Sequence, residues 1–208
     1  MEGLRYVEFE SATNRWLIGW QAIVCGAASA WTRDLGRLGK PIMRSLMLEA
    51  NQTVNIAVLD SGSVRYVGQV LSLGGKRGAA RPGSHSPMHT TASGKVLLAY
   101  SSPDEVDTFL AGAALGRRTE ASIVERDRLF SQFAAIRARG YAVDDQENET
   151  SIRCIAAPVF DRHRHVRASL SISGEVARLP DDRIRSLGDT LAAAAQRMTR
   201  DIGMLLAA

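Results

Sequence analysis

Two short segments carry the side chains best suited to binding or chemistry in this sequence. The first, Ile152–Phe160, contains Cys154, and the second, Ala168–Ser173, has a serine at every second position. Alternate side chains of a β-strand share one face. If the cysteine face and the serine face lie side by side in one sheet, they form a floor for a small polar ligand. The alternative is that Cys154 is a small buried hydrophobe and that the serines face solvent.

A second candidate site is the helix start that follows Pro87. Small residues at three successive positions, Ala92, Ser93 and Gly94, leave the backbone N–H groups of the first turn uncovered. The helix dipole favours negative charge at this point, so these groups would bind a carboxylate. Met88 would then supply part of an apolar wall. The alternative is a helix start that only packs close to a sheet.

Asp144 begins a polar, acidic run that extends to Glu149, and such a run is usually a solvated loop. In a pocket, Asp144 would repel a carboxylate. We therefore expect it to accept a hydrogen bond from the other end of the ligand, or to be protonated if burial raises its pKa. The complete set of candidate binding residues is Met88, Ala92, Ser93, Gly94, Asp144, Ile152, Cys154, Ser171 and Ser173.

The sequence lacks the motifs of common enzyme classes. Gly94-Lys95 is followed by Val96 rather than by the hydroxyl residue of a phosphate-binding loop, and no serine stands in a nucleophile elbow. The four histidines have no metal-ligand spacing, and we expect the turn residues His163 and His165 to face water. We therefore expect no enzymatic activity, no cofactor and no metal. The remaining alternative is an enzyme with Cys154 as nucleophile, for which the candidate bases are His85 and His89.

The composition is that of a globular protein. The chain has 208 residues, with 26 basic and 22 acidic side chains, 45% hydrophobic residues and two cysteines. These counts fit one domain with an additional arm and exclude a disordered or collagen-like chain. We expect a cytoplasmic protein without a membrane partner, because the sequence shows neither a long apolar run nor a signal peptide. The segment Ser61–Pro103 holds five basic and no acidic residues, which favours an acidic small-molecule ligand or a solvated basic loop.

The elements that would position these residues follow from the periodicity. Apolar spacing predicts helices over Trp16–Trp31 and Pro41–Ala50, after a short strand or extended linker at residues 6–9. The period changes to two at Thr53, and we predict a hairpin of strands 53–60 and 63–71 across Ser61-Gly62. Residues 74–88 are expected to form a loop.

Three helix starts follow, each with a capping residue, and two of them have a glutamate three positions later. They are Thr90 or Thr91, Ser102 with Glu105, and Ser122 with Glu125. We further predict a short strand at Gly140–Val143, a hairpin of strands 152–160 and 166–173, and a final helix from Pro180 to about Leu205. This order of elements predicts an α+β domain with an antiparallel sheet.

Four stretches of the chain, taken together, resemble the sequence pattern of a known protein family. They are His89–Ala99, Arg139–Glu147, Ile152–Phe160, and Ala168–Gly174 with Arg178-Leu179. In this order and spacing they resemble the effector-binding domain of the IclR family of bacterial transcription regulators, over roughly residues 4–205. The resemblance implies a GAF-like or profilin-like domain with a central antiparallel sheet flanked by helices, preceded by a linker helix.

The resemblance also implies a division of the chain and a set of partners. Residues 1–33 would be a wing remnant and linker helix, and residues 34–208 the effector-binding domain. The DNA-reading helices of the winged helix-turn-helix domain are not in this sequence, so we expect operator DNA to be bound only through that domain. The large apolar residues of segment 16–31 lead us to expect a homodimer or tetramer.

The function implied by the resemblance is that of a ligand-sensing domain. It would bind a small organic or aromatic acid and modulate operator binding of the intact regulator, whether repressor or activator. Carried over residue by residue, the family's ligand pocket falls on Ala92, Ser93, Asp144, Ile152, Cys154, Ser171 and Ser173. Ser93 stands where some relatives have alanine, so an additional hydroxyl would alter the choice of effector.

Overall fold

The fold is seen in a computed structural model that describes residues 4, 6–10, 13–19, 21–22, 35–73, 80–112 and 115–205. Its N-terminal part is a two-stranded antiparallel sheet of β1 (Val7–Glu10) and β2 (Arg15–Ile18). The predicted helix over Trp16–Trp31 is therefore wrong at its start. Trp16 and Ile18 alternate toward one face and pair with Phe9 and Val7, which is the pattern of a strand. Residues 20 and 23–31 of that prediction lie outside the described residues.

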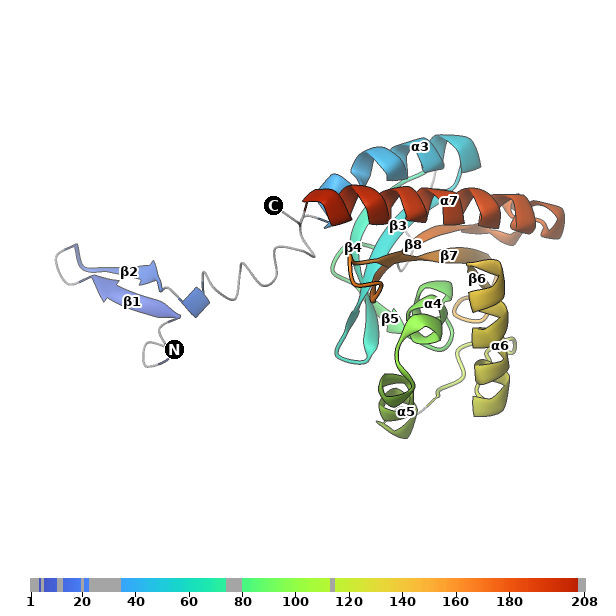
Figure 1. Cartoon of the computed structure of the whole chain (residues 1–208), viewed down its shortest axis with the longest axis horizontal. Coiled ribbons are helices and arrows are strands. Elements are labelled where there is room, and N and C mark those ends of the chain that lie inside the picture. The colour runs from blue at the N-terminus through green and yellow to red at the C-terminus, as the bar shows by residue number, and fades with distance from the viewer. Residues whose placement is uncertain are drawn as a thin grey trace.

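A six-stranded antiparallel sheet forms the centre of the molecule (Figure 1). Its strands, in the order in which they neighbour one another, are β5 (His85–Pro87), β4 (Ser63–Val70), β3 (Thr53–Asp60), β8 (Val166–Glu175), β7 (Ile152–Phe160) and β6 (Ala142–Asp145). Both predicted hairpins are confirmed. The turn at Ser61-Gly62 has φ values of 48° and 76°, which match the right-handed twist of the flanking strands.

The segment 74–88 is not a loop throughout. Residues 85–87 form β5 and pair with β4, although residues 74–79 lie outside the described residues. The triplet His-Ser-Pro gave no alternating pattern long enough to predict a strand. Its pairing with Ser63, Val64 and Arg65 is a tertiary contact that local sequence does not encode.

Helices cover both faces of the sheet (Figure 1). On one face lie α3 (Lys40–Ala50) and α7 (Asp181–Leu205), and on the other lie α4 (Ala92–Tyr100), α5 (Pro103–Gly112) and α6 (Arg126–Arg139). Each layer buries its own apolar cluster against the sheet. A single 3-10 turn, η2 (Val176–Arg178), connects β8 to α7. The predicted α+β architecture with a central antiparallel sheet is confirmed.

Two of the three predicted helix caps are confirmed. Thr91 accepts a hydrogen bond from the Gly94 N–H at 3.1 Å, and Ser102 and Glu105 bond to each other's backbone N–H groups at 2.8 and 3.3 Å. The cap at Ser122 is wrong, because α6 begins only at Arg126. The Ser122 hydroxyl is buried and donates instead to the Glu147 carbonyl oxygen at 2.7 Å.

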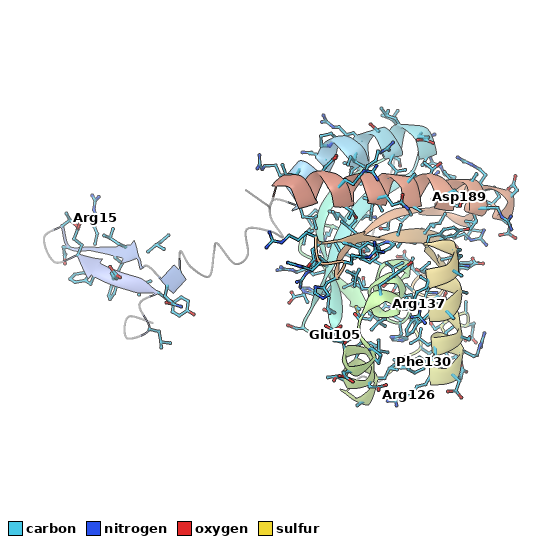
Figure 2. All side chains as sticks on the ribbon, in the orientation of Figure 1. Arg15, Glu105, Arg126, Phe130, Arg137 and Asp189 are labelled. Atoms are coloured by element: carbon cyan, nitrogen blue, oxygen red, sulfur yellow. The ribbon has the colours of Figure 1, made fainter. Side chains whose placement is uncertain are left out.

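Arginine side chains connect α6 to its neighbours (Figure 2). Arg137 donates to the Ala99 carbonyl oxygen at the end of α4 at 2.7 Å, and Arg126 donates to the Leu110 carbonyl oxygen of α5. Arg137 therefore links α6 to α4, and Arg126 links α6 to α5. Across the described ranges, no helix combines the length and apolar character needed to span a bilayer.

Candidate functional site

A cavity of about 420 Å³ lies over the sheet, beside the start of α4. Its floor forms because the two predicted faces coincide: Cys154 of β7 pairs with Ser173 of β8, and Ala156 pairs with Ser171. Ser171 is buried rather than facing bulk water. The alternative of solvent-facing serines is therefore wrong for this face.

Seven of the nine candidate residues line this cavity, and two do not. The lining residues are Ala92, Ser93, Asp144, Ile152, Cys154, Ser171 and Ser173. Met88 is instead part of the apolar cluster beneath α4 and is 1% exposed. At Gly94, an added Cβ would lie 2.2 Å from the Met88 carbonyl oxygen, because the first turn of α4 rests on that backbone.

The backbone N–H of Gly94 is also unavailable to a ligand. Its N–H already donates to the Thr91 hydroxyl that caps the helix. The N–H groups of Ala92 and Ser93 come before it in the first turn, where an α-helix has no carbonyl partner for them. The backbone N–H groups left without a helical partner at this end of the cavity are therefore those of two of the three candidate residues, Ala92 and Ser93.

Two hydroxyl groups face the cavity without a partner. Ser93 and Ser171 are each 3% exposed, and neither hydroxyl has a hydrogen bond to any residue that the structure describes. Buried polar groups in native proteins are nearly always paired. Neither hydroxyl oxygen is among the fully enclosed unpaired atoms of the described residues, so water or a ligand in the cavity can supply the partner.

An amide pair extends the polar floor onto β3 and β4. The Asn55 amide donates to the Ser173 hydroxyl at 3.1 Å, and the Gln69 amide donates to the Asn55 side-chain oxygen at 2.9 Å. These two residues were absent from the sequence-based site. A signal existed: Asn55 is polar and in phase with Thr53 in a strand whose other residues are mostly apolar.

Asp144 lies at the wall of the cavity and is buried. Its carboxylate accepts the backbone N–H groups of Glu147 at 2.7 Å and Asn148 at 3.3 Å. Loss of hydration raises the pKa of Asp144 to about 7, against the opposing effects of the Lys95 charge and of these hydrogen bonds. The group therefore changes charge close to neutral pH.

Lys95 is a buried cation close to the site that the sequence did not identify. Its side chain is fully buried, and its ammonium group donates to the Val143 carbonyl oxygen at 2.6 Å and to the Glu147 carboxylate. Burial raises the pKa of Glu147. A lysine in the middle of an apolar helix was the available signal, but its partner is 52 positions away in the chain.

The arrangement does not activate Cys154 as a nucleophile. Burial raises the pKa of its thiol well above the ordinary value, and the nearby carboxylates of Asp144 and Glu149 raise it further. The candidate bases His85 and His89 contact Asp60 and the Gly116 carbonyl oxygen, and neither lines the cavity. The described part of the chain also contains no group of three or more His, Cys, Asp or Glu residues placed to hold a metal ion.

Known proteins are similar to this chain over nearly its whole length. The family model described as "Bacterial transcriptional regulator IclR C-terminal" matches residues 27–200. The transcriptional repressor IclR of Escherichia coli (strain K12) is 35% identical over 205 residues, which are 98% of this chain and 75% of that protein. The HTH-type transcriptional regulator KdgR of the same strain is 34% identical over 203 residues, covering 98% of this chain and 77% of KdgR.

Solved structures agree with these relatives. The C-terminal domain of E. coli KdgR is 34% identical, with a TM-score of 0.73, and covers 82% of this chain and 99% of that one. The Thermotoga maritima IclR structure is 27% identical, with a TM-score of 0.79, and covers 97% of this chain and 81% of that one. The chain therefore belongs to the IclR family of bacterial transcriptional regulators and contains the family's C-terminal effector-binding domain.

Proposed function

We propose that this chain senses a small organic or aromatic acid in the cavity beside α4 and performs no chemistry on it. The observation that carries the proposal is the pair of buried, unpartnered hydroxyls of Ser93 and Ser171 in the same cavity as the start of α4. A carboxylate at the Ala92 and Ser93 N–H groups would satisfy the helix terminus. A volume of about 420 Å³ lies in the range of small-ligand sites.

The proposed binding set is Ala92, Ser93, Asp144, Ile152, Cys154, Ser171 and Ser173. The serine hydroxyls and the Cys154 thiol would offer neutral hydrogen-bonding groups, and Ile152 would supply an apolar contact. Asp144 would accept a hydrogen bond from a hydroxyl group at the end of the ligand away from the carboxylate.

The test is titration calorimetry after a thermal-shift screen of small carboxylates. A bound acid at 100 times its dissociation constant should stabilise the fold by about 2.7 kcal/mol. Ser171→Ala and Ser173→Ala should each cost about 0.5–1.5 kcal/mol of affinity. Ser131→Ala, in an exposed position on α6, is the matched control and should leave affinity unchanged.

Cys154→Ser separates sensing from catalysis. We expect altered ligand affinity, with no turnover of the bound acid by either form of the protein when mixtures are followed by NMR. Turnover that disappears in Cys154→Ser would favour the enzyme instead. A ligand whose affinity ignored Cys154→Ser, Asp144→Asn, Ser171→Ala and Ser173→Ala would bind elsewhere.

Within the intact regulator, occupancy of the cavity is proposed to shift the arrangement of a homodimer or tetramer and so change operator affinity, in repression or in activation. Contacts to operator DNA would come from the family's winged helix-turn-helix domain. The proposed site of action is the cytoplasm. The names of the relatives as transcriptional regulators support this role.

A further inference from the structure

Exposed basic side chains gather at one end of the effector-binding domain. They come from the beginning of α3, the turn between β7 and β8, and the C-terminal part of α7. We call this set the basic end, and its residues are Arg37, Lys40, Arg44, Arg162, Arg164, Arg167, Arg197 and Arg200. The three segments 37–44, 160–167 and 196–201 hold these eight basic residues and two acidic ones, Asp161 and Asp201. Because the net charge of the whole chain is +4, the rest of the chain is net negative.

Two tertiary contacts bring the three segments to the same end of the fold. The Phe160 N–H, next to the β7–β8 turn, donates to the Thr199 hydroxyl of α7 at 3.1 Å. Just before α3, an added Cβ at Gly39 would lie 2.8 Å from the Met198 Cε, so the beginning of α3 rests on the same part of α7. Figure 1 shows the beginning of α3 beside the end of α7.

The acidic residue of the β7–β8 turn is used within the turn. The Asp161 carboxylate accepts the backbone N–H groups of His163 at 2.8 Å and His165 at 2.9 Å, and the Arg167 Nε–H at 2.8 Å. These bonds fix the backbone of the turn before any partner arrives. They also leave the other two arginines of the turn without a neutralising carboxylate.

Four guanidinium groups of the basic end form no ion pair with any carboxylate of the described residues. They are those of Arg162, Arg164, Arg197 and Arg200. The Arg162 side chain donates to a ring nitrogen of His163 at 3.0 Å, which leaves its charge unbalanced. Like charges held close together repel one another, so a bound polyanion would stabilise this end of the domain.

The arrangement fits an extended row of phosphates better than a small anion. None of the basic-end residues lines the cavity beside α4, and they are spread over three elements instead of converging on one point. The forked guanidinium group matches phosphate geometry. Duplex DNA presents about one negative charge per 1.7 Å of its axis.

The path of the chain favours DNA as the polyanion. The chain belongs to a family of bacterial transcriptional regulators. Leu35, the first described residue of the effector-binding domain, packs in one apolar cluster with Met198 of α7, so the chain enters the domain at the basic end. A winged helix-turn-helix domain N-terminal to this segment would therefore be tethered next to the basic end.

We propose that the basic end binds the phosphate backbone of duplex DNA beside the bases that the winged helix-turn-helix domain reads. Phosphate contacts add affinity and fix orientation but carry no sequence information. The proposal extends the expectation that operator DNA is bound only through the winged helix-turn-helix domain, because the bases would still be read only there. It does not depend on which molecule the cavity binds.

The experiment measures how salt weakens the binding of random-sequence duplex DNA to the full chain. Fluorescence anisotropy with a labelled duplex gives the affinity, and the logarithm of the affinity falls linearly with the logarithm of the salt concentration. Arg162→Gln combined with Arg164→Gln should reduce this slope by about 1 for each charge removed. Between about 50 and 200 mM salt, the wild type should then lose about 10-fold more affinity than the double variant.

A matched control removes the same charge elsewhere. Arg128→Gln combined with Arg185→Gln changes two exposed arginines, on α6 and near the start of α7, and should leave the slope unchanged. Arg162→Lys combined with Arg164→Lys keeps both charges and should keep most of the slope, which separates loss of charge from a change in the shape of the turn.

A second double variant tests the helical part of the basic end. Arg197→Gln combined with Arg200→Gln should reduce the slope by about as much as the change in the turn. Equal slopes for the wild type and both basic-end variants, or an equal reduction by the control pair, would overturn the proposal. So would absence of duplex binding at about 50 mM salt, where phosphate contacts are strong. Tighter binding of a single-stranded RNA with the same number of phosphates would overturn duplex DNA as the partner.

Discussion

At the scale of single residues, the ionisation of Asp144 is the feature that should couple pH to stability and to binding of the proposed anionic ligand. The Asp144 side chain is held by two backbone N–H groups and faces the buried charge of Lys95, yet burial raises its pKa to about 7. The carboxyl group is therefore protonated in the folded chain at a pH at which the unfolded chain has already lost the proton.

The first prediction is a pH-dependent difference between wild type and Asp144→Asn. The stabilising contribution of the Asp144 proton is fully present below the ordinary pKa of 3.8 and is lost as the pH rises through about 7. The asparagine side chain of the variant would be neutral throughout, so the variant should gain stability relative to wild type as the pH increases from 5 to 8. A rise of about 3 pKa units bounds the gain at about 4 kcal/mol.

Urea unfolding at several pH values measures this difference, and Asp161→Asn is the control. Burial raises the pKa of Asp161, but hydrogen bonds from Arg167 and from the backbone of His165 and His163 lower it to about 2. Its contribution is lost only in acid, and the exposed His165 imidazole, 3.5 Å from its Oδ2, forms at most a weak ion pair with it, so the cost of Asp161→Asn should change far less from pH 5 to 8 than that of Asp144→Asn. A constant difference for Asp144→Asn as well would contradict the assignment.

The same group should make ligand binding depend on pH. An anionic ligand meets a neutral Asp144 below pH 7 and a negative one above it. We expect affinity for a small carboxylate to fall as the pH rises from 6 to 8, and Asp144→Asn to remove most of this fall. Titration calorimetry in buffers of matched ionic strength checks it, and a pH-independent wild-type affinity would show that the charge of Asp144 does not act on the bound ligand.

At the scale of elements, the first turn of α4 fixes the geometry of the site. Gly94 lets this turn rest directly on the backbone of Met88. Gly94→Ala should destabilise the fold by about 3 kcal/mol, because backbone atoms cannot move aside as a flexible side chain can. Calorimetry should show the melting temperature fall by roughly 6–12 °C.

Gly112, the last residue of α5, supplies the matched control. An added Cβ there would meet no atom of the described residues within 4 Å. Gly112→Ala should therefore leave stability unchanged or raise it by up to about 1 kcal/mol, as expected for alanine in an exposed helix. Equal effects of the two substitutions would mean that α4 does not approach Met88 as described.

Local periodicity accounts for the elements that could be predicted. Alternation and the Ser61-Gly62 turn predicted the hairpins, and their register then brought the Cys154 and serine faces together. Elements whose existence depends on tertiary pairing could not be predicted, as the short strand β5 shows. The late start of α6 has the same origin, since Ser122 binds the distant Glu147 carbonyl oxygen instead of capping a helix.

The residues of the candidate site also divide into those that local periodicity predicts and those that depend on tertiary contacts. Residues on one strand face followed from period two. The ion pair of Lys95 with Glu147 joins residues 52 positions apart, and only the folded chain brings them together. Met88 and Gly94 belong to the set predicted from the sequence, because proximity to the helix start does not reveal which backbone and side-chain atoms are covered by neighbouring groups.

At the scale of the whole molecule, the N-terminal hairpin presents an apolar face. Trp16 and Ile18 are 59% and 75% exposed, and Phe9 lies beside Trp16 with its ring centroid 5.1 Å away. We expect the chain to self-associate through its N-terminal segment and effector domain. Light scattering at micromolar concentration should give a multiple of the single-chain mass.

Two substitutions test whether the apolar face of the hairpin, rather than any exposed aromatic side chain, causes self-association. Trp16→Ser should reduce self-association, because it removes the largest exposed apolar group of the hairpin. Phe130→Ser, at an exposed aromatic position on α6 visible in Figure 2, should not. A single-chain mass for the wild type would contradict the expectation, as would equal effects of the two changes.

The lengths of the outermost strands have a further consequence, for the kind of assembly open to the protein. The six-stranded sheet ends in β5, of three residues, and in β6, of four. Short edge strands offer few unpaired N–H and C=O groups, and Pro87 in β5 lacks an N–H altogether. Neither edge can template a continuous intermolecular sheet. The central sheet is thus protected against edge-to-edge aggregation, and we expect copies of the protein to meet through helices, loops or the N-terminal hairpin rather than through the edges of this sheet.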